Sequence, residues 1–256
     1  AILYSNPNNP SWICLTDDEL QTIGELSSLY DVPVIEDLAY FAMDFREDLS
    51  QPGVPPFQAT VARYTDNWLM LISSSKSFSY AGQRIGCMVV SDALAKRDFS
   101  ELSTFFPSSI LSQALLYGVM AVLSSGVSVA PQYGFAAMLR AANDGEYNFV
   151  EDVREYGQRA AEMKRLFVAN GFEIVYDQDL DRPLADGFYF TVAYPGMGGG
   201  ELLRELLEYG ISAISLGATG SERTDGLRAC VSHVHPRQFP VLEERLRAFN
   251  ARHGVR

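Results

Sequence analysis

The sequence has little that would suit it to nucleic acids, membranes or an oxidising compartment. Its 256 residues include 20 Lys and Arg against 32 Asp and Glu, and the net charge of −12 disfavours nucleic-acid backbones and anionic membranes as partners. No apolar run approaches the roughly 20 residues of a membrane-spanning helix, and the N-terminus lacks the basic flank of a signal peptide. The three cysteines are odd in number and far apart, which is typical of reduced thiols. We therefore expect a cytoplasmic protein that binds neither nucleic acid nor membrane.

The sequence also offers no recognisable metal or nucleotide motif. His233 and His235 would face the same side of a strand, but no cysteine or carboxylate cluster completes a metal site beside them. The glycine-rich run at 196–200 lacks the GK[ST] ending of a P-loop. We interpret the histidines as structural and the glycines as a flexible entry to the next helix.

Short apolar runs alternate with helical patterns in the first part of the chain. Thr16 to Glu19 form a capping box, and apolar residues at helical spacing follow to Leu29. Further helices are predicted at 93–105 and 109–124, and strands at 1–4, 32–35, 69–72 and 86–90. This alternation predicts a layered α/β domain, in which ligands bind beyond the carboxyl ends of parallel strands.

The pattern changes at residue 147. A long amphipathic helix is predicted at 147–170, and it would connect two domains. Short strands at 172–176, 187–192, 211–215 and 226–231 then alternate with helices at 200–208 and 238–252. We therefore predict two domains, residues 1–146 and residues 147–256, of which the second is a smaller α+β domain.

Lys76 stands at the end of a predicted strand, directly after three serines. A lysine packed among apolar residues and near another cation has a lowered pKa, and its amine can form a Schiff base with a carbonyl group. Arg84 supplies such a cation, and Ser73, Ser75 and Arg84 together could hold a phosphate. An isolated lysine would more simply be a solvated surface residue.

The residues around Lys76 resemble the lysine signature of the class I/II aminotransferases, which are fold-type I enzymes that depend on pyridoxal 5′-phosphate. Two more motifs of that family precede it in the same order, Asn-Pro-Asn-Asn-Pro at 6–10 and Asp-Leu-Ala-Tyr at 37–40. The resemblance covers the whole chain, more loosely towards its C-terminus. It implies a three-layer sandwich with a mostly parallel sheet, whose C-terminal part would be residues 1–146. Residues 147–256 would be a bridging helix and a small substrate-closing domain.

The resemblance implies cofactor contacts for several residues. Lys76 would form the internal Schiff base with pyridoxal phosphate and would also be the base that moves the substrate proton. Asp37 would pair with the pyridinium nitrogen, and Tyr40 and Asn9 would donate hydrogen bonds to the phenolic oxygen. From the residues alone, Asp37 could instead cap a turn, Tyr40 could be a half-buried aromatic, and Asn9 could be a turn residue.

The resemblance also implies how the charged groups of cofactor and substrate are bound. Ser73, Ser75 and Arg84 would bind the phosphate, since the planar guanidinium suits its oxygens. In the small domain Arg228, on the predicted strand at 226–231, would bind the substrate α-carboxylate, with Asn9 also contacting substrate. A structural ion pair of Arg228 is the alternative.

The sequence departs from the family pattern in two respects. The asparagine motif usually continues with Thr-Gly, whereas this chain has Ser11 and Trp12, and Trp12 removes a flexible glycine. Family members are also longer, and we identify no phosphate-binding turn, stacking aromatic or N-terminal arm upstream. We therefore expect upstream sequence to be missing.

The motifs predict an aminotransferase that moves an amino group between an L-amino acid and a 2-oxo acid, as a homodimer when complete. A carbon–sulfur β-lyase would use the same lysine, aspartate, tyrosine and arginine, so the motifs do not separate the two reactions. Some bacterial transcription regulators also carry an aminotransferase-like domain behind a DNA-binding module. The sequence does not identify the substrate amino acid.

Overall fold

The computed structural model describes residues 1–46, 51–184 and 187–254, and the chain divides into two compact units. The first unit consists of residues 1–6, 15–41 and 50–149, and the second of residues 7–14, 42–49 and 150–256. The chain therefore passes between the units five times, after residues 6, 14, 41, 49 and 149.

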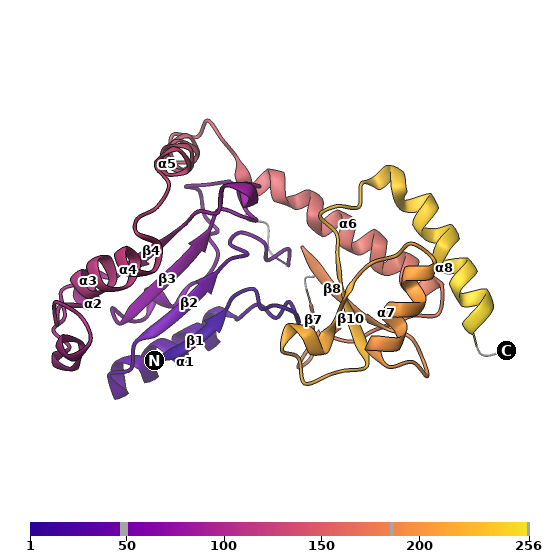
Figure 1. Ribbon diagram of the computed structural model, residues 1–256, viewed down its shortest axis with the longest axis horizontal. Coiled ribbons are helices and arrows are strands. Elements are labelled where there is room, and N and C mark those ends of the chain that lie inside the picture. The colour runs from indigo at the N-terminus through magenta and orange to yellow at the C-terminus, as the bar shows by residue number, and fades with distance from the viewer. Residues whose placement is uncertain (47–50, 185–186, 255–256) are drawn as a thin grey trace. The chain divides into compact units, whose positions relative to one another are not determined.

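The first unit is built on a mostly parallel sheet, as predicted (Figure 1). Strands β1 (Ile2–Ser5), β2 (Val34–Leu38) and β3 (Trp68–Ser73) are parallel, and β4 (Gly86–Val90) pairs antiparallel with β3. Within the described residues the strand order is β1-β2-β3-β4. Because β2 and β3 are parallel neighbours, their carboxyl ends meet at one edge of the sheet, which is where such sheets bind ligands.

Helices of the first unit follow the sequence pattern only in part. The chain at the predicted helix 93–105 forms the short helix α2 (Asp92–Ala95) and a 3₁₀ turn, because Asp98 pairs with Ile110 in an isolated bridge that draws the chain out of the helix. The segment predicted at 109–124 is helical but contains a π-helical stretch (Ala114–Met120) between α3 (Leu111–Gln113) and α4 (Ala121–Ser124). Helix α5 (Val129–Asn143) was not predicted.

The predicted capping box is present at the start of helix α1 (Asp17–Tyr30). Thr16 Oγ1 accepts a hydrogen bond from the Glu19 amide at 3.3 Å, and Glu19 Oε2 accepts one from the Thr16 amide at 2.8 Å. We expect Thr16→Ala to lower the free energy of unfolding by about 1 kcal/mol. The Glu19 amide would lose its acceptor, and the Glu19 carboxylate would lose the hydroxyl that helps to hold it against the Thr16 amide. Urea denaturation measures this, and Thr22→Ala, an exposed hydroxyl within the same helix, should change it far less.

The second unit packs helices against a small antiparallel sheet with the order β5-β8-β10-β9 (Figure 1). Its core is a cluster of buried apolar residues centred on Phe190, Leu227 and Phe249. This sheet and its helices agree with the predicted α+β architecture, whereas the predicted domain bounds stay a prediction. Its elements are α6 (Phe149–Ala169), β5 (Glu173–Ile174), β6 (Gln178–Asp179), β7 (Arg182–Pro183), β8 (Tyr189–Ala193), α7 (Gly199–Glu208), β9 (Ile214–Ser215), β10 (Gly226–Cys230) and α8 (Phe239–His253).

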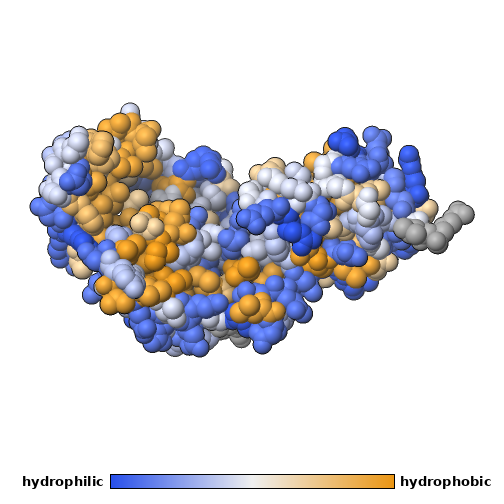
Figure 2. Space-filling model, turned by 90° about the horizontal axis from the view of Figure 1, so that it is seen from below, coloured by the Kyte–Doolittle hydropathy of each residue, from blue (hydrophilic) through white to orange (hydrophobic). Residues whose placement is uncertain are grey.

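The first unit exposes many large apolar side chains. Figure 2 shows apolar residues gathered over this unit, on the left of the view. The exposed residues include Tyr117, Val122 and Leu123 around α4, and Val129 and Tyr133 on α5. Contiguous apolar surface of this kind marks an interaction site more often than a solvated face. Among the helices that the structure describes, none combines the length and apolar character that crossing a bilayer requires.

Candidate active site

Four of the predicted site residues line one cavity at the carboxyl edge of the first unit's sheet. Asp37, Ser73, Ser75 and Arg84 surround a space of about 390 Å³. Its remaining walls come from β3, β4 and the residues just before β4. Residues from two of the three motifs therefore meet around one space, although Asp37 and Arg84 are 47 positions apart in the sequence.

Asp37 is positioned by the end of β2. Its Oδ1 atom accepts a hydrogen bond from the Ala39 amide at 2.9 Å, and its backbone carbonyl accepts one from the Asn6 amide at 3.0 Å. The Asp37 side chain lines the cavity, while Oδ2 accepts no hydrogen bond from the described residues. Asp37 thus does cap its turn, and it keeps one carboxylate oxygen available to a ligand.

Hydroxyl and guanidinium groups form the other polar wall of the cavity. Ser73 Oγ accepts a hydrogen bond from the Ser75 amide at 3.1 Å, so its own proton remains available to donate. Arg84 lies in the left-handed region with φ of 51° and is exposed, and its Nη1 donates to the Ala81 carbonyl at 2.9 Å. Two hydroxyls and a cation are the groups that bind phosphate oxygens.

The close approach of β4 to β3 depends on Gly86. Gly86 lies opposite Ser73 in the antiparallel register, and a Cβ atom at position 86 would be 2.7 Å from the Ile72 carbonyl oxygen. Any side chain there would push the strands apart and displace Arg84, which is two residues away. The glycine of the lysine signature therefore has a packing reason in this chain.

Lys76 is half-buried in a turn that serine hydroxyls hold in place. Ser74 Oγ donates to the Ile85 carbonyl at 2.5 Å, and Ser77 Oγ donates to the Phe41 carbonyl. The second bond joins the Lys76 turn to the turn that carries Tyr40, whose side chain is buried. The predicted lysine and tyrosine thus lie on two turns that are connected by one side-chain hydrogen bond.

Arg228 and Asn9 contact each other in the second unit, although they are 219 positions apart. Arg228 Nη1 donates to Asn9 Oδ1 at 2.7 Å, and its guanidinium carbon lies 3.9 Å from the centre of the Tyr189 ring. The Nε atom is buried without a hydrogen-bond partner, and Arg228 forms no ion pair with the carboxylates that the structure describes. A half-buried cation with only neutral neighbours is suited to bind an anion. Sequence reasoning missed the contact of Arg228 with Tyr189. Knowledge that β8 pairs with β10 would have suggested it.

The asparagine loop accommodates Trp12 where the family usually has glycine. Trp12 adopts φ of 64°, in the left-handed region that glycine favours, and its amide donates to the Asn8 carbonyl at 2.9 Å. Its indole is fully buried and donates to the Met43 carbonyl at 3.3 Å. Burial of this large side chain offsets the unfavourable backbone conformation.

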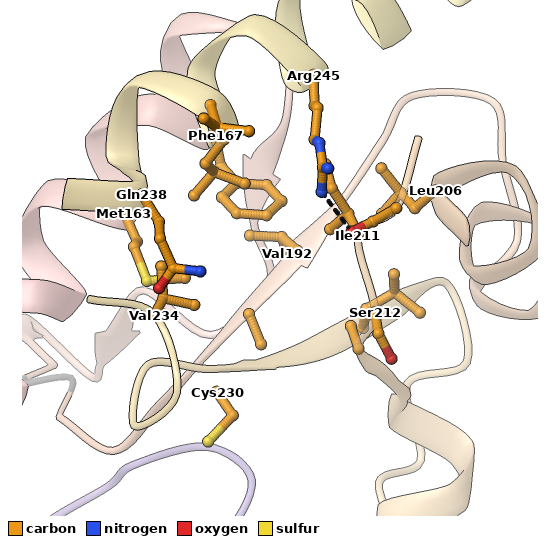
Figure 3. Close-up of a pocket in the computed structure, with 16 residues that line it drawn as sticks. Met163, Phe167, Val192, Leu206, Ile211, Ser212, Cys230, Val234, Gln238 and Arg245 are labelled. Carbon is orange, nitrogen blue, oxygen red and sulfur yellow. Dashed lines mark hydrogen bonds between the residues drawn. The ribbon is translucent and has the colours of Figure 1, made fainter. Parts of the chain in front are cut away.

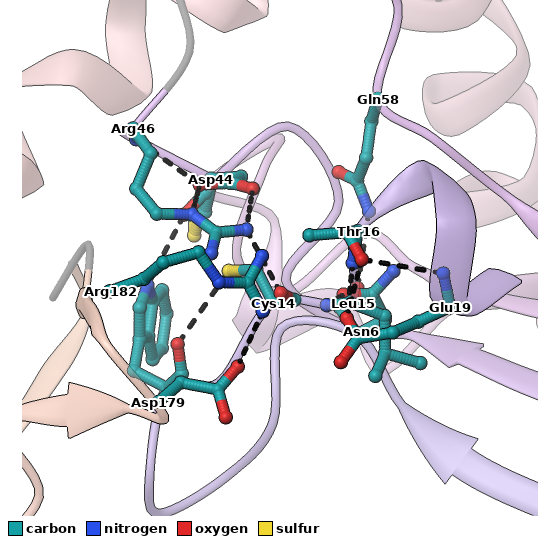
Figure 4. A network of polar contacts seen from close by, with 12 residues as sticks. Asn6, Cys14, Leu15, Thr16, Glu19, Asp44, Arg46, Gln58, Asp179 and Arg182 are labelled. Carbon is teal, nitrogen blue, oxygen red and sulfur yellow. Dashed lines mark hydrogen bonds and ion pairs between the residues drawn. The ribbon is translucent and has the colours of Figure 1, made fainter.

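Polar networks hold the two ends of this loop region (Figure 4). In the first unit Asn6 Oδ1 accepts from the Leu15 amide at 3.1 Å, and Gln58 donates to the Asn6 carbonyl at 3.2 Å. In the second unit Arg46 pairs with Asp44 at 2.7 Å and donates to the Cys14 carbonyl at 2.9 Å. The first network thus joins the two residues that flank the loop within the first unit, and the second fixes Cys14 within the second unit.

Glu36 is a buried carboxyl that sequence reasoning missed. It precedes Asp37 on β2, so it faces the opposite side of the sheet, where it is fully buried. Burial raises its pKa to about 7, although the hydrogen bond from the Val61 amide acts in the opposite direction. The alternation of the strand could have revealed its burial, because Glu36 lies on the same face as the apolar residues Val34 and Leu38.

Comparison with known proteins defines first the fold and then the family. An Escherichia coli methionine aminotransferase, YbdL, matches 96% of this chain and 58% of its own with a TM-score of 0.71 and 18% identity. A Rhodobacter sphaeroides aspartate aminotransferase matches 99% and 57% with a TM-score of 0.68 and 20% identity. The fold is therefore that of the pyridoxal-phosphate aminotransferases.

Sequence comparison gives the family. Residues 1–246 match the model described as aminotransferase class I and II, and the chain belongs to that family. A probable aspartate aminotransferase of Methanocaldococcus jannaschii is 24% identical over 233 residues, which are 89% of this chain and 52% of the relative. An aspartate aminotransferase of Bacillus subtilis is 28% identical over 127 residues, or 47% of this chain. The chain thus spans about half the length of the Methanocaldococcus jannaschii relative.

Members of this family use pyridoxal phosphate, and the cavity at the sheet edge fits that group. Asp37 offers an acceptor for a protonated ring nitrogen, and Ser73, Ser75 and Arg84 offer donors for a phosphate. The acceptor and the donors of this cavity therefore match the two polar ends of the cofactor, its ring nitrogen and its phosphate.

Proposed function

We propose that the protein to which this chain belongs is a pyridoxal-phosphate-dependent aminotransferase that transfers an amino group between an L-amino acid and a 2-oxo acid. The observation that carries this proposal is the single cavity that unites Asp37, Ser73, Ser75 and Arg84 at the sheet edge, beside the Lys76 turn. When bound, pyridoxal phosphate supplies an aldehyde that condenses with amines and a ring that withdraws electrons.

Asp37 and Lys76 carry the proton chemistry in this proposal. With the cofactor bound, the Oδ2 oxygen of Asp37 would accept a hydrogen bond from the ring nitrogen and keep it protonated. The Lys76 amine would hold the cofactor and would be the base for the proton at the substrate Cα. The Tyr40 hydroxyl and the Asn9 amide would donate to the phenolic oxygen.

Binding of the charged groups falls to two arginines. Arg84 binds the phosphate together with the hydroxyls of Ser73 and Ser75. Arg228 binds the substrate α-carboxylate, because the contacts that the described residues give its guanidinium, Asn9 and the Tyr189 ring, are neutral and its buried Nε–H has no partner among them. Asn9, which accepts from Arg228 at 2.7 Å, orients the guanidinium and contacts substrate.

We also propose that the complete protein is a cytoplasmic homodimer. The exposed apolar residues on α4 and α5 of the first unit support association, because burying them in an interface removes unfavourable apolar surface from water. The acidic net charge and the free thiols support the location.

A cofactor-loading experiment tests the function. The protein is incubated with pyridoxal phosphate, and single L-amino acids are then added while absorbance is recorded. We expect a cofactor band that moves to the shorter wavelength of the pyridoxamine form, and borohydride reduction should leave the cofactor on the Lys76 peptide. Pyruvate and ammonia from cystathionine, without amino transfer to 2-oxoglutarate, would support the lyase instead. Absence of any covalent cofactor would contradict both.

Removal of the Arg228 charge should affect substrate but not cofactor. We expect Arg228→Met to raise the amino-acid concentration for half-maximal conversion by roughly 100-fold, because charge-assisted hydrogen bonds to the carboxylate are lost. Cofactor attachment at Lys76 should be unchanged. Arg223→Met, which removes an exposed arginine paired with Asp225, is the matched control. Equal effects of both variants would argue against a substrate contact by Arg228.

A further inference from the structure

The second unit contains an apolar cavity that the proposed function does not use. It lies between the face of the sheet formed by β8 and β10 and the helices α6 and α8 (Figure 3). Val192, Leu227 and Ala229 of the sheet line it, and Phe167 and Leu242 line it from the helices. Its volume of about 290 Å³ is far above the small defects that a close-packed core leaves.

The size of the cavity limits the ligand. An apolar protein cavity of about 150 Å³ accommodates benzene, which has six carbon atoms. A cavity of about 290 Å³ therefore has room for an apolar body of roughly seven to ten carbons. This is below the usual range for drug-sized ligands and fits a small aliphatic or aryl group.

The rim of the cavity carries hydrogen-bond donors and one positive charge. The lining residues include Arg245, Gln238 and Ser212, all exposed, but neither aspartate nor glutamate. Such a rim is unusual in a chain with 32 acidic and 20 basic residues. Figure 3 shows the three side chains around the mouth, with Arg245 and Gln238 coming from the region of α8.

Arg245 is available to a ligand. Its Nη1 donates to the Gly210 carbonyl at 2.9 Å, which fixes the guanidinium at the mouth and leaves its other N–H groups to solvent. No carboxylate in the described part of the chain forms an ion pair with it. A fixed, planar and uncompensated guanidinium above an apolar cavity complements a carboxylate that is attached to an apolar body.

We propose that this cavity binds a small monocarboxylic acid, with its apolar body of about seven to ten carbons inside and its carboxylate on Arg245. The site is built entirely from the second unit. It is separate from the residues to which substrate and cofactor binding are assigned above, so it stands whether or not the proposed function holds.

Octanoate is the probe, and octanamide is its uncharged counterpart. Calorimetric titration of the full chain should give saturable octanoate binding with a submillimolar Kd, and octanamide should bind roughly tenfold more weakly. Arg245→Met should weaken octanoate by the same factor and remove the preference for the carboxylate. Arg247→Met, an exposed arginine on the same helix but outside the lining, is the matched control and should bind like the parent protein.

A second variant tests occupation of the cavity itself. Val241 is exposed and lies at the lining, so Val241→Trp should place a ring in the mouth without disturbing the core, and it should abolish binding of both probes. Circular dichroism checks that each variant is folded. The proposal is overturned if octanoate does not saturate the parent protein, if octanamide binds equally well, or if Arg245→Met or Val241→Trp leaves octanoate binding unchanged.

Discussion

Replacement of Lys76 by alanine is expected to abolish covalent cofactor attachment and to reduce amino transfer to the background rate. Both roles proposed for Lys76 need its amine, and no other amine of the Lys76 turn can replace it. Lys76 is one of three lysines in the chain, together with Lys96 and Lys164. Loss of the base alone would lower the rate by about 100-fold to 10,000-fold.

Lys96→Ala is the matched control for this experiment. Lys96 is 77% exposed and pairs with Asp92 on α2, in the same unit as Lys76. Its removal should leave both the absorbance band and the adduct unchanged. Added methylamine should partly restore the reaction of Lys76→Ala, because a free amine can supply the missing base. An undiminished borohydride-stable adduct in Lys76→Ala would refute the assignment.

Replacement of Glu36 by glutamine is expected to stabilise the protein at neutral and alkaline pH. Glu36 is fully buried, and burial raises its pKa from 4.5 to about 7. A shift of this size corresponds to roughly 3 kcal/mol of free energy of unfolding that is lost when the carboxyl ionises in the folded state. Glutamine keeps an acceptor for the Val61 amide but carries no charge.

The pH dependence follows from the sign of this shift. Between pH 4.5 and about 7 the folded protein holds the Glu36 proton while the unfolded chain releases it, so stability falls as the pH rises. The benefit of Glu36→Gln should therefore be near zero at pH 4.5, grow across this window and be constant above it. Urea denaturation at several pH values measures this, with the exposed Glu222→Gln as control. A constant difference at all pH values would show that ionisation is not responsible.

Features that depend on neighbouring residues could be predicted from the sequence. The cap at Thr16 and the start of α1 agree with the structure because their hydrogen bonds join residues three positions apart. The predicted strand at 86–90 likewise agrees with β4. All the residues that determine these features lie within a few positions of one another in the sequence.

Features that depend on distant residues could not be predicted in the same way. The helix expected at 93–105 is interrupted because Asp98 pairs with Ile110, and residue propensities carry no trace of that bridge. The stacking of Arg228 on Tyr189 needs the register of two strands that are far apart in the sequence. The roles assigned to the site residues stay predictions until the cofactor experiments are done.

The fully buried Trp12 has a consequence for how this sequence can vary. A Cβ atom on Gly187 would be 2.4 Å from the Phe45 ring and 2.7 Å from the Trp12 ring, so these two rings together occupy the space of a side chain at position 187. Trp12→Gly alone would relieve the backbone but leave a cavity beside that glycine. A larger residue at the position of Gly187 needs both rings to give way, so relatives that carry one should have smaller residues at the positions of Trp12 and Phe45, and the three positions should covary.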